Sequence, residues 1–194
     1  METYNFFAML SRMKYINRWG LMRNTRDENI SEHSLETAII AHAIAITGNK
    51  FYDRNYDTDR VAVLALYHDV SEILTGDMPT PVKYHSKKII DAYKEVEKTA
   101  NEKLLSLLPD YLYDDYKPLL SMENEDPELK KIVKAADKIS ALIKCIEETK
   151  SGNSEFLTAE KTIRKTIDDM NLAEVDYFVE KFIPPYKYTL DELN

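Results

Sequence analysis

The sequence predicts an all-α fold in a single domain, and three observations lead to this prediction. Residues that break helices are rare, because the 194 residues include only 4 Gly and 7 Pro. Apolar residues recur at helical spacing along most of the chain, and no segment alternates with a period of two for long enough to form a strand. The length allows one substantial core, and no linker or repeat divides it. We therefore expect residues 1–194 to form one helical bundle.

Each predicted helix has apolar residues three or four positions apart. In chain order the predicted helices span residues 6–13, 31–48, 60–74, 89–107, 127–150, 158–170 and 173–182. Ser31 is expected to cap the second helix and Gly48 to end it. Leu35 and Ile39 are expected on the buried face of that helix. The polar segment 17–30 and the proline-containing segment 75–81 are predicted to be loops.

The composition excludes several classes of protein. A net charge of −8 opposes non-specific attraction to nucleic acid. No stretch approaches the roughly 20 apolar residues that cross a bilayer, and the N-terminus lacks the pattern of a signal peptide. Cys145 is the only cysteine, so no disulfide framework forms within the chain. We therefore expect a cytoplasmic protein that binds neither a nucleic-acid polymer nor a membrane.

The strongest sign of chemistry is an adjacent pair, His68 and Asp69, inside an apolar stretch predicted to be helical. His33 lies near the start of an earlier predicted helix, and Asp137 interrupts a later one. Two imidazoles and two carboxylates form a mixed nitrogen and oxygen site that suits Mn, Co, Fe, Zn or Cu better than Ca, and it lacks the thiolates of a structural zinc site. The pattern predicts that one divalent metal ion is bound by His33, His68, Asp69 and Asp137.

Glu72 follows His68 by four residues and Asp69 by three, so a continuous helix would place it on the same face, beside the ion. There it would act as an acid or a base, and the sequence leaves both open. A simpler interpretation also remains, because a buried Asp137 could be neutralised by Lys134 or Lys138 instead of a metal. His42 and His85, which lack such company, are expected to be packed or surface residues.

The segment before His33 is basic although the protein is acidic. Its positive residues are Arg12, Lys14, Arg18, Arg23 and Arg26. Such a cluster suits an anionic substrate, with Arg as a bidentate partner for phosphate. Trp19, the only tryptophan, follows Arg18 directly. It is either a core residue or a flat wall against a sugar or base.

The order of His33, His68-Asp69 and Asp137 along the chain resembles the H…HD…D pattern of the HD-domain metal-dependent phosphohydrolases. The sequence around these four residues resembles the bacterial HD-domain 5′-deoxynucleotidases of the YfbR type over nearly the whole chain. The similar segments are Phe6-Phe7-Ala8, Leu10-Ser11-Arg12, Ile16-Asn17-Arg18-Trp19, Leu21-Met22-Arg23-Asn24, Glu28-Asn29, Ser31-Glu32-His33-Ser34-Leu35, Tyr67-His68-Asp69, Leu74-Thr75-Gly76-Asp77, Pro79-Thr80-Pro81-Val82-Lys83-Tyr84 and Asp176-Tyr177-Phe178. The chain departs from this pattern at Gly20, where proline is expected, and at Met78, where leucine is expected.

The resemblance implies hydrolysis of deoxyribonucleoside 5′-monophosphates with one divalent transition metal ion, such as Co, Mn, Cu or Zn, and a homodimer. It implies metal ligation by His33, His68, Asp69 and Asp137 and catalytic roles for Glu72 and Arg18. Substrate contacts are implied for Arg18, Trp19, His33, Asp69, Asp77, Met78, Pro79, Thr80 and Asp137. Two alternatives stay open: an HD-type phosphohydrolase that acts on another nucleotide, and a helical binding or scaffold protein with a structural metal.

Overall fold

The computed structural model describes residues 3–194, and its regular structure is helical. Its α-helices are α1 (Phe6–Leu10), α2 (Ile30–Phe51), α3 (Thr58–Tyr67), α4 (Glu72–Thr75), α5 (Thr80–Lys83), α6 (Lys87–Leu105), α7 (Asp110–Ser121), α8 (Pro127–Lys150), α9 (Leu157–Asp168) and α10 (Ala173–Phe182). Within this range the only β-type pairing is an isolated bridge between Asn17 and Asn29. The predicted all-α fold class is confirmed. None of the described helices combines the length and the apolar character that a bilayer crossing requires.

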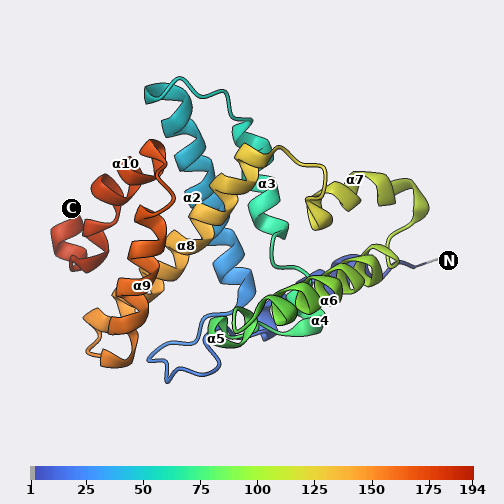
Figure 1. Ribbon diagram of the computed structural model, residues 1–194, viewed down its shortest axis with the longest axis horizontal. Helices are drawn as coiled ribbons and strands as arrows, with labels where there is room; N and C mark the ends of the chain where they lie inside the picture. Colours follow the sequence, from blue (N-terminus) through green and yellow to red (C-terminus); the bar gives the residue numbers. More distant parts are fainter. Residues whose placement is uncertain (1–2) are drawn as a thin grey trace.

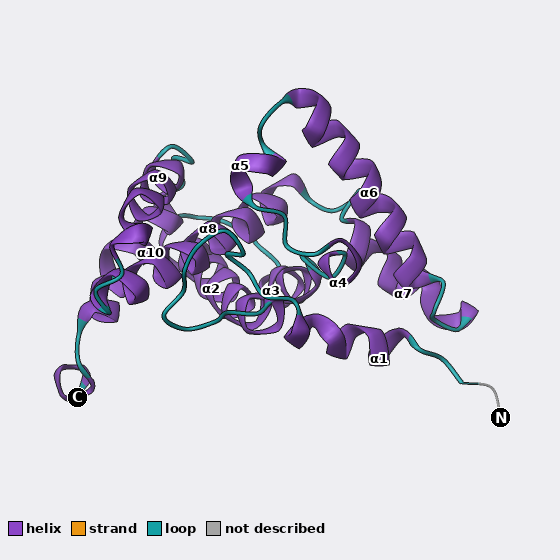
Figure 2. Ribbon diagram, turned by 90° about the horizontal axis from the view of Figure 1, so that it is seen from below, coloured by secondary structure: helices purple, strands orange, loops and turns teal. Residues whose placement is uncertain are grey.

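Three helices form the centre of the molecule. α2 and α8 cross each other, and α3 lies beside α2 and also contacts α8 (Figure 1). Seen from below, α9 and α10 lie on one side of this centre, and α6 and α7 lie on the other (Figure 2). Ile44, Leu64, Ile139 and Leu142 from the three central helices are fully buried. Residues on these helices are therefore held in a rigid, closely packed setting.

The start and end of α2 differ from the prediction. The N-cap is Asn29 rather than Ser31, because the Asn29 side chain accepts hydrogen bonds from the backbone N–H groups of Ser31 and Glu32. The helix also continues through Gly48 to Phe51. Gly48 serves close packing there, since a Cβ atom at this position would lie 2.7 Å from the Tyr56 ring. It does not end the helix.

The prediction that Leu35 and Ile39 lie on the buried face of α2 was wrong. Leu35 and Ile39 are 57% and 62% exposed, whereas His33, Thr37 and Ile44 are fully buried. The reason is tertiary: α3, α8 and α10 all contact α2 and bury other faces of the helix. An exposed apolar stripe is left on this central helix.

The predicted helix 60–74 is interrupted at the His-Asp pair. α3 ends at Tyr67, and residues 68–71 form a turn before α4 begins at Glu72. The Nδ1 atom of His68 lies 2.7 Å from the Ala65 carbonyl oxygen, so the imidazole supplies a hydrogen bond to the last turn of α3. The chain can then turn without leaving that carbonyl unpaired.

Two helices were not predicted. α5 occupies the end of the segment 75–81 that the prolines marked as a loop, with Pro81 in its first turn. α7 contains Pro118, and Tyr111, Tyr113 and Tyr116 stand among its three leucines, so the helical periodicity of its apolar residues was less evident. Both lie outside the central layer.

Candidate active site

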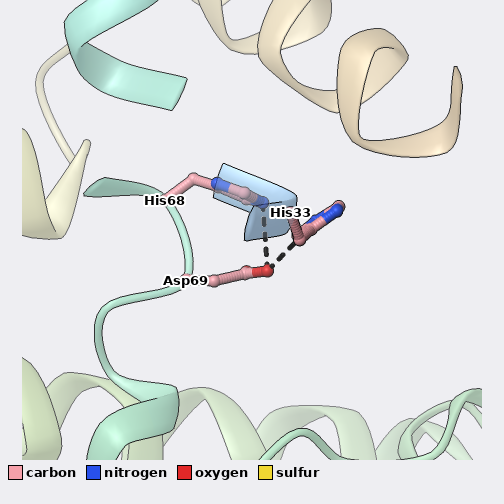
Figure 3. Close-up of side chains that lie close together, drawn as sticks. All are labelled: His33, His68 and Asp69. Carbon is pink, nitrogen blue, oxygen red and sulfur yellow. Dashed lines mark ion pairs between the residues drawn. The ribbon is translucent and has the colours of Figure 1, made fainter. Parts of the chain in front are cut away.

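The structure brings the four predicted metal ligands together. His33 lies in the first turn of α2, while His68 and Asp69 lie in the turn after α3, and one possible ligand atom from each lies within 4.8 Å of the others (Figure 3). Asp69 Oδ2 is 3.0 Å from His68 Nε2 and 3.5 Å from His33 Nε2. Asp137 approaches from α8, with Oδ1 3.2 Å from His33 Nε2. α2, the turn after α3, and α8 thus bring residues that are distant in sequence to one point.

The two imidazoles present the same edge to this point. Each Nδ1 has a partner: Ser140 Oγ at 3.0 Å for His33, and the Ala65 carbonyl oxygen at 2.7 Å for His68. Both Nε2 atoms are buried and have no hydrogen-bond partner among the described residues. An imidazole that donates from Nδ1 offers a lone pair at Nε2, and two such lone pairs facing carboxylates repel unless a proton or a metal ion lies between them. The residues therefore fit a divalent transition metal ion.

The alternative partner for Asp137 is also present. Lys138 Nζ lies 2.9 Å from Asp137 Oδ2, whereas Lys134 is exposed. Burial alone would raise the pKa of Asp137, but Lys138 and His33 hold it below its usual value. Lys138 occupies only one carboxylate oxygen, so the other still faces His33. The lysine and a metal ion are compatible at this carboxylate.

Arg18 and Trp19 are held by a residue that the sequence analysis did not assign to the site. Glu28 Oε2 accepts hydrogen bonds from Arg18 Nη1 and from Trp19 Nε1, both at 2.9 Å. Asp77 Oδ2 accepts the Trp19 backbone N–H at 3.2 Å, which joins this loop to the predicted substrate loop. Trp19 has a left-handed φ of 62°, a conformation that costs about 1–2 kcal/mol for a residue with a Cβ. The hydrogen bond to Asp77 holds the strained Trp19 backbone, and the hydrogen bond to Glu28 holds the indole.

Arg18 faces the same carboxylates as the metal candidate. Its side chain is 11% exposed, and its buried Nε has no hydrogen-bond partner among the described residues. Burial lowers its pKa, yet the negative charges of Glu28, Asp137, Asp69 and Asp77 raise it above the usual value. A guanidinium with unused donors beside this cluster can bind an anion.

The five basic residues of the segment before His33 differ in their burial. Arg18 alone is held among the carboxylates of the site, whereas the other four basic residues of the segment, Arg12, Lys14, Arg23 and Arg26, are exposed. Arg26, for example, pairs with the half-exposed carboxylate of Glu32. Met78, Pro79 and Thr80 follow Asp77 directly in the chain, and their contact with a substrate stays a prediction.

Glu72 lies at the start of α4 and is only 5% exposed. It reaches this place through the turn at residues 68–71, not through the continuous helix that the sequence suggested. Its Oε2 is buried and has no hydrogen-bond partner among the described residues. Burial and the negative charges of Asp69 and Asp77 raise its pKa to about 10. Glu72 therefore carries a proton at neutral pH in the metal-free protein.

This raised pKa predicts how stability depends on pH. The folded protein binds a proton at Glu72 that the unfolded chain has already released, so the metal-free protein loses stability as the pH rises from the usual carboxyl range toward about 10. Glu72→Gln cannot lose that proton, so its melting temperature should rise relative to the wild type between about pH 5 and about pH 9. Thermal unfolding of both proteins without metal measures this. A temperature difference that does not change with pH would contradict the assignment.

Comparisons with known proteins agree with this geometry. Residues 5–186 match a family model described as 5′-deoxynucleotidase YfbR-like. A 5′-deoxynucleotidase of Cronobacter sakazakii is 47% identical over 194 residues, which cover 100% of this chain and 98% of the relative. A 5′-deoxynucleotidase of Yersinia pestis is 48% identical over 190 residues, or 98% of this chain and 96% of the relative.

Solved structures share the fold. An HD-domain phosphohydrolase from Listeria innocua superposes with a TM-score of 0.81 at 26% identity, covering 94% of this chain and 88% of that one. An HD phosphohydrolase of cyanophage S-2L, bound to dA and one catalytic Zn²⁺, superposes with a TM-score of 0.67 at 20% identity, covering 97% of this chain and 98% of that one. At that identity the second likeness concerns the fold alone. Together with the family match, the converging His33, His68, Asp69 and Asp137 lead to one conclusion: the chain belongs to the YfbR-like 5′-deoxynucleotidase family.

Proposed function

We propose that this protein hydrolyses deoxyribonucleoside 5′-monophosphates to deoxyribonucleosides and phosphate, using one divalent transition metal ion such as Co, Mn, Cu or Zn. The observation that carries the proposal is the convergence of two unpartnered imidazole Nε2 atoms with Asp69 and Asp137, beside the unused donors of Arg18. The names of the full-length relatives support the substrate class. His33, His68, Asp69 and Asp137 would hold the ion.

Each residue of the site has a proposed part in the reaction. A divalent ion at such a site lowers the pKa of water and polarises a phosphoryl oxygen. Arg18 binds the phosphate through its free guanidinium donors and stabilises the charge that develops on it. Water attacks phosphorus and the bond to the 5′-oxygen breaks. Glu72 donates its proton to that leaving oxygen and takes up a proton from the attacking water, so it ends the reaction protonated as it began. A scaffold with a structural metal would use neither the buried free donors of Arg18 nor the unpaired carboxyl of Glu72.

Trp19 is proposed to select the sugar. Its ring lies 5.3 Å from the Phe156 ring and 5.8 Å from the Arg18 guanidinium carbon. Glu28 and Asp77 fix its position, so the indole is a rigid wall next to the phosphate-binding arginine. A rigid wall can reject a 2′-hydroxyl by steric clash. Asp77, Met78, Pro79 and Thr80 are proposed to complete the substrate contacts.

Two substitutions separate phosphate binding from sugar selection. Arg18→Ala should reduce kcat/KM for dAMP and AMP by similar factors, because Arg18 contacts the phosphate that both share. Trp19→Ala should raise the AMP to dAMP ratio of kcat/KM, since the wall is lost. Trp19→Phe keeps a ring but loses the hydrogen bond to Glu28, and should give an intermediate ratio. Equal kcat/KM for AMP and dAMP in the wild type would contradict deoxyribose selection.

We also propose that the chain is a homodimer that uses the exposed face of α2. Leu35 and Ile39 lie one helical turn apart on that face and are both more than half exposed. Ile39→Glu should then convert a dimer into a monomer, as measured by light scattering after size exclusion. Leu190→Glu is the control, because Leu190 is 77% exposed in the C-terminal 3-10 turn and should leave the mass unchanged. A wild-type protein with the mass of one chain would contradict the proposal.

Two further proposals concern the domain organisation and the cellular location of the protein. We propose that residues 1–194 act as one catalytic domain, which is supported by a single hydrophobic core cluster with residues from Phe6 to Ile183. We propose a cytoplasmic location, which suits the substrate class and the buried, unpaired Cys145.

A further inference from the structure

His33 is connected to a second pair of residues on the ring edge opposite Nε2. Its Nδ1 lies 3.0 Å from Ser140 Oγ, and Ser140 in turn donates a hydrogen bond of 2.6 Å to Glu36 Oε2. Both His33 and Ser140 are fully buried. Glu36 lies on α2, three residues after His33, and Ser140 lies on α8, three residues after Asp137. The connection therefore joins the two helices that carry His33 and Asp137.

The chemistry of these groups fixes the direction of the hydrogen bonds. A carboxylate only accepts, and a serine hydroxyl has one hydrogen to donate. Because Ser140 donates to Glu36, its oxygen can only accept from His33, and Nδ1 must carry the ring hydrogen. The lone pair is then at Nε2, the atom that faces Asp69 and Asp137 without a hydrogen-bond partner among the described residues.

We propose that Glu36 and Ser140 are positioning residues that hold His33 in the Nδ1–H tautomer and so keep Nε2 ready to bind the metal. This inference rests on the proposed function, because it requires that the site binds a divalent ion. It assigns a role to two residues with no direct part in the proposed reaction. Outer hydrogen-bond partners of metal-bound histidines are typically worth about 10–100-fold in metal affinity.

A purely structural role would look different in experiments. The Glu36–Ser140 hydrogen bond also ties α2 to α8, so its loss could lower stability without changing His33. Only a positioning role predicts a change in the tautomer of His33 and a specific loss of metal affinity. The readouts must therefore report on the imidazole and the metal directly, not on turnover.

The test uses the full chain, freed of metal, in the wild type and in Ser140→Ala, Glu36→Met and the double variant. Ser34→Ala is the matched control, because Ser34 adjoins His33 in sequence and its buried hydroxyl has no hydrogen-bond partner among the described residues. Zn²⁺ affinity is measured by competition with a chelator, and the nitrogen chemical shifts of His33 report its tautomer. Thermal unfolding confirms that each variant is folded.

We expect about 10–100-fold weaker Zn²⁺ binding for Ser140→Ala and loss of the pure Nδ1–H signal. Glu36→Met should weaken binding in the same direction, and the double variant should be no weaker than Ser140→Ala alone, since Glu36 acts through Ser140. Zn²⁺ affinity within threefold of wild type together with an unchanged tautomer in Ser140→Ala would overturn the inference. A wild-type protein that binds no Zn²⁺, Co²⁺ or Mn²⁺ would instead overturn the proposed function.

Discussion

Replacement of Asp69 by alanine is expected to abolish turnover and most metal binding. Among residues 3–194, Asp69 Oδ2 is the one carboxylate oxygen within 3.5 Å of both imidazole Nε2 atoms, so its loss removes the centre of the ligand set. The loss of metal affinity should exceed the roughly 10–100-fold effect of an outer partner. Metal content and phosphate release of the purified variant measure the two effects. His68→Ala should behave in the same way, because it removes a ligand from the same turn.

The control for this prediction is Asp59→Ala. Asp59 is an almost fully exposed carboxylate, 4.0 Å from the half-exposed His42, and so forms a His-Asp pair outside the site. The Asp59→Ala variant should keep the metal content and the turnover rate of the wild type. Full metal occupancy and wild-type turnover in Asp69→Ala would remove the site assignment.

Replacement of Glu72 by alanine is expected to lower the rate about 10²–10⁴-fold while metal binding is kept, because a general acid contributes about that much. Glu72 lies beside the ligand cluster, and its Oε2 is buried and has no hydrogen-bond partner among the described residues. Single-turnover phosphate release from dAMP, with metal content measured in parallel, separates the two properties. Glu95→Ala, an exposed carboxylate on α6, is the control. A rate within threefold of wild type would mean that Glu72 takes no part in proton transfer.

The helices that carry strong local signals could be predicted from the sequence. The predicted bounds of α8 and α10 agree with the structure, since Pro127 follows the capping residue Asp126, and Pro184 follows α10 closely. The interruption at His68 could not be predicted, because it depends on a hydrogen bond from the imidazole to the Ala65 carbonyl. Nor could the exposure of Leu35 and Ile39, since the burial of a central helix depends on where its neighbours pack.

The residues of the candidate site were likewise predicted only where the local sequence carries a signal. His33, His68, Asp69 and Asp137 were predicted because imidazoles and carboxylates are costly on apolar helices unless something binds them. Glu28 and Ser140 were missed, since each looks like an ordinary polar residue in the sequence. Ser140 meets His33 only after the chain has closed over 107 positions. The sequence feature that pointed to Glu28 was its charge, because a carboxylate at the end of the loop that begins at Arg18 can pair with that arginine.

The central claim is that this site performs metal-dependent hydrolysis of a 5′-phosphate. The most direct measurement is phosphate release from dAMP by the metal-free protein, before and after addition of Mn²⁺, Co²⁺, Cu²⁺, Zn²⁺ or Mg²⁺, with the 3′-monophosphate of deoxyadenosine as the control substrate. The account predicts no release without metal, restored release with at least one transition metal ion, and little release from the 3′-monophosphate. Undiminished release from the metal-free protein, or no release with any of these ions, would contradict it.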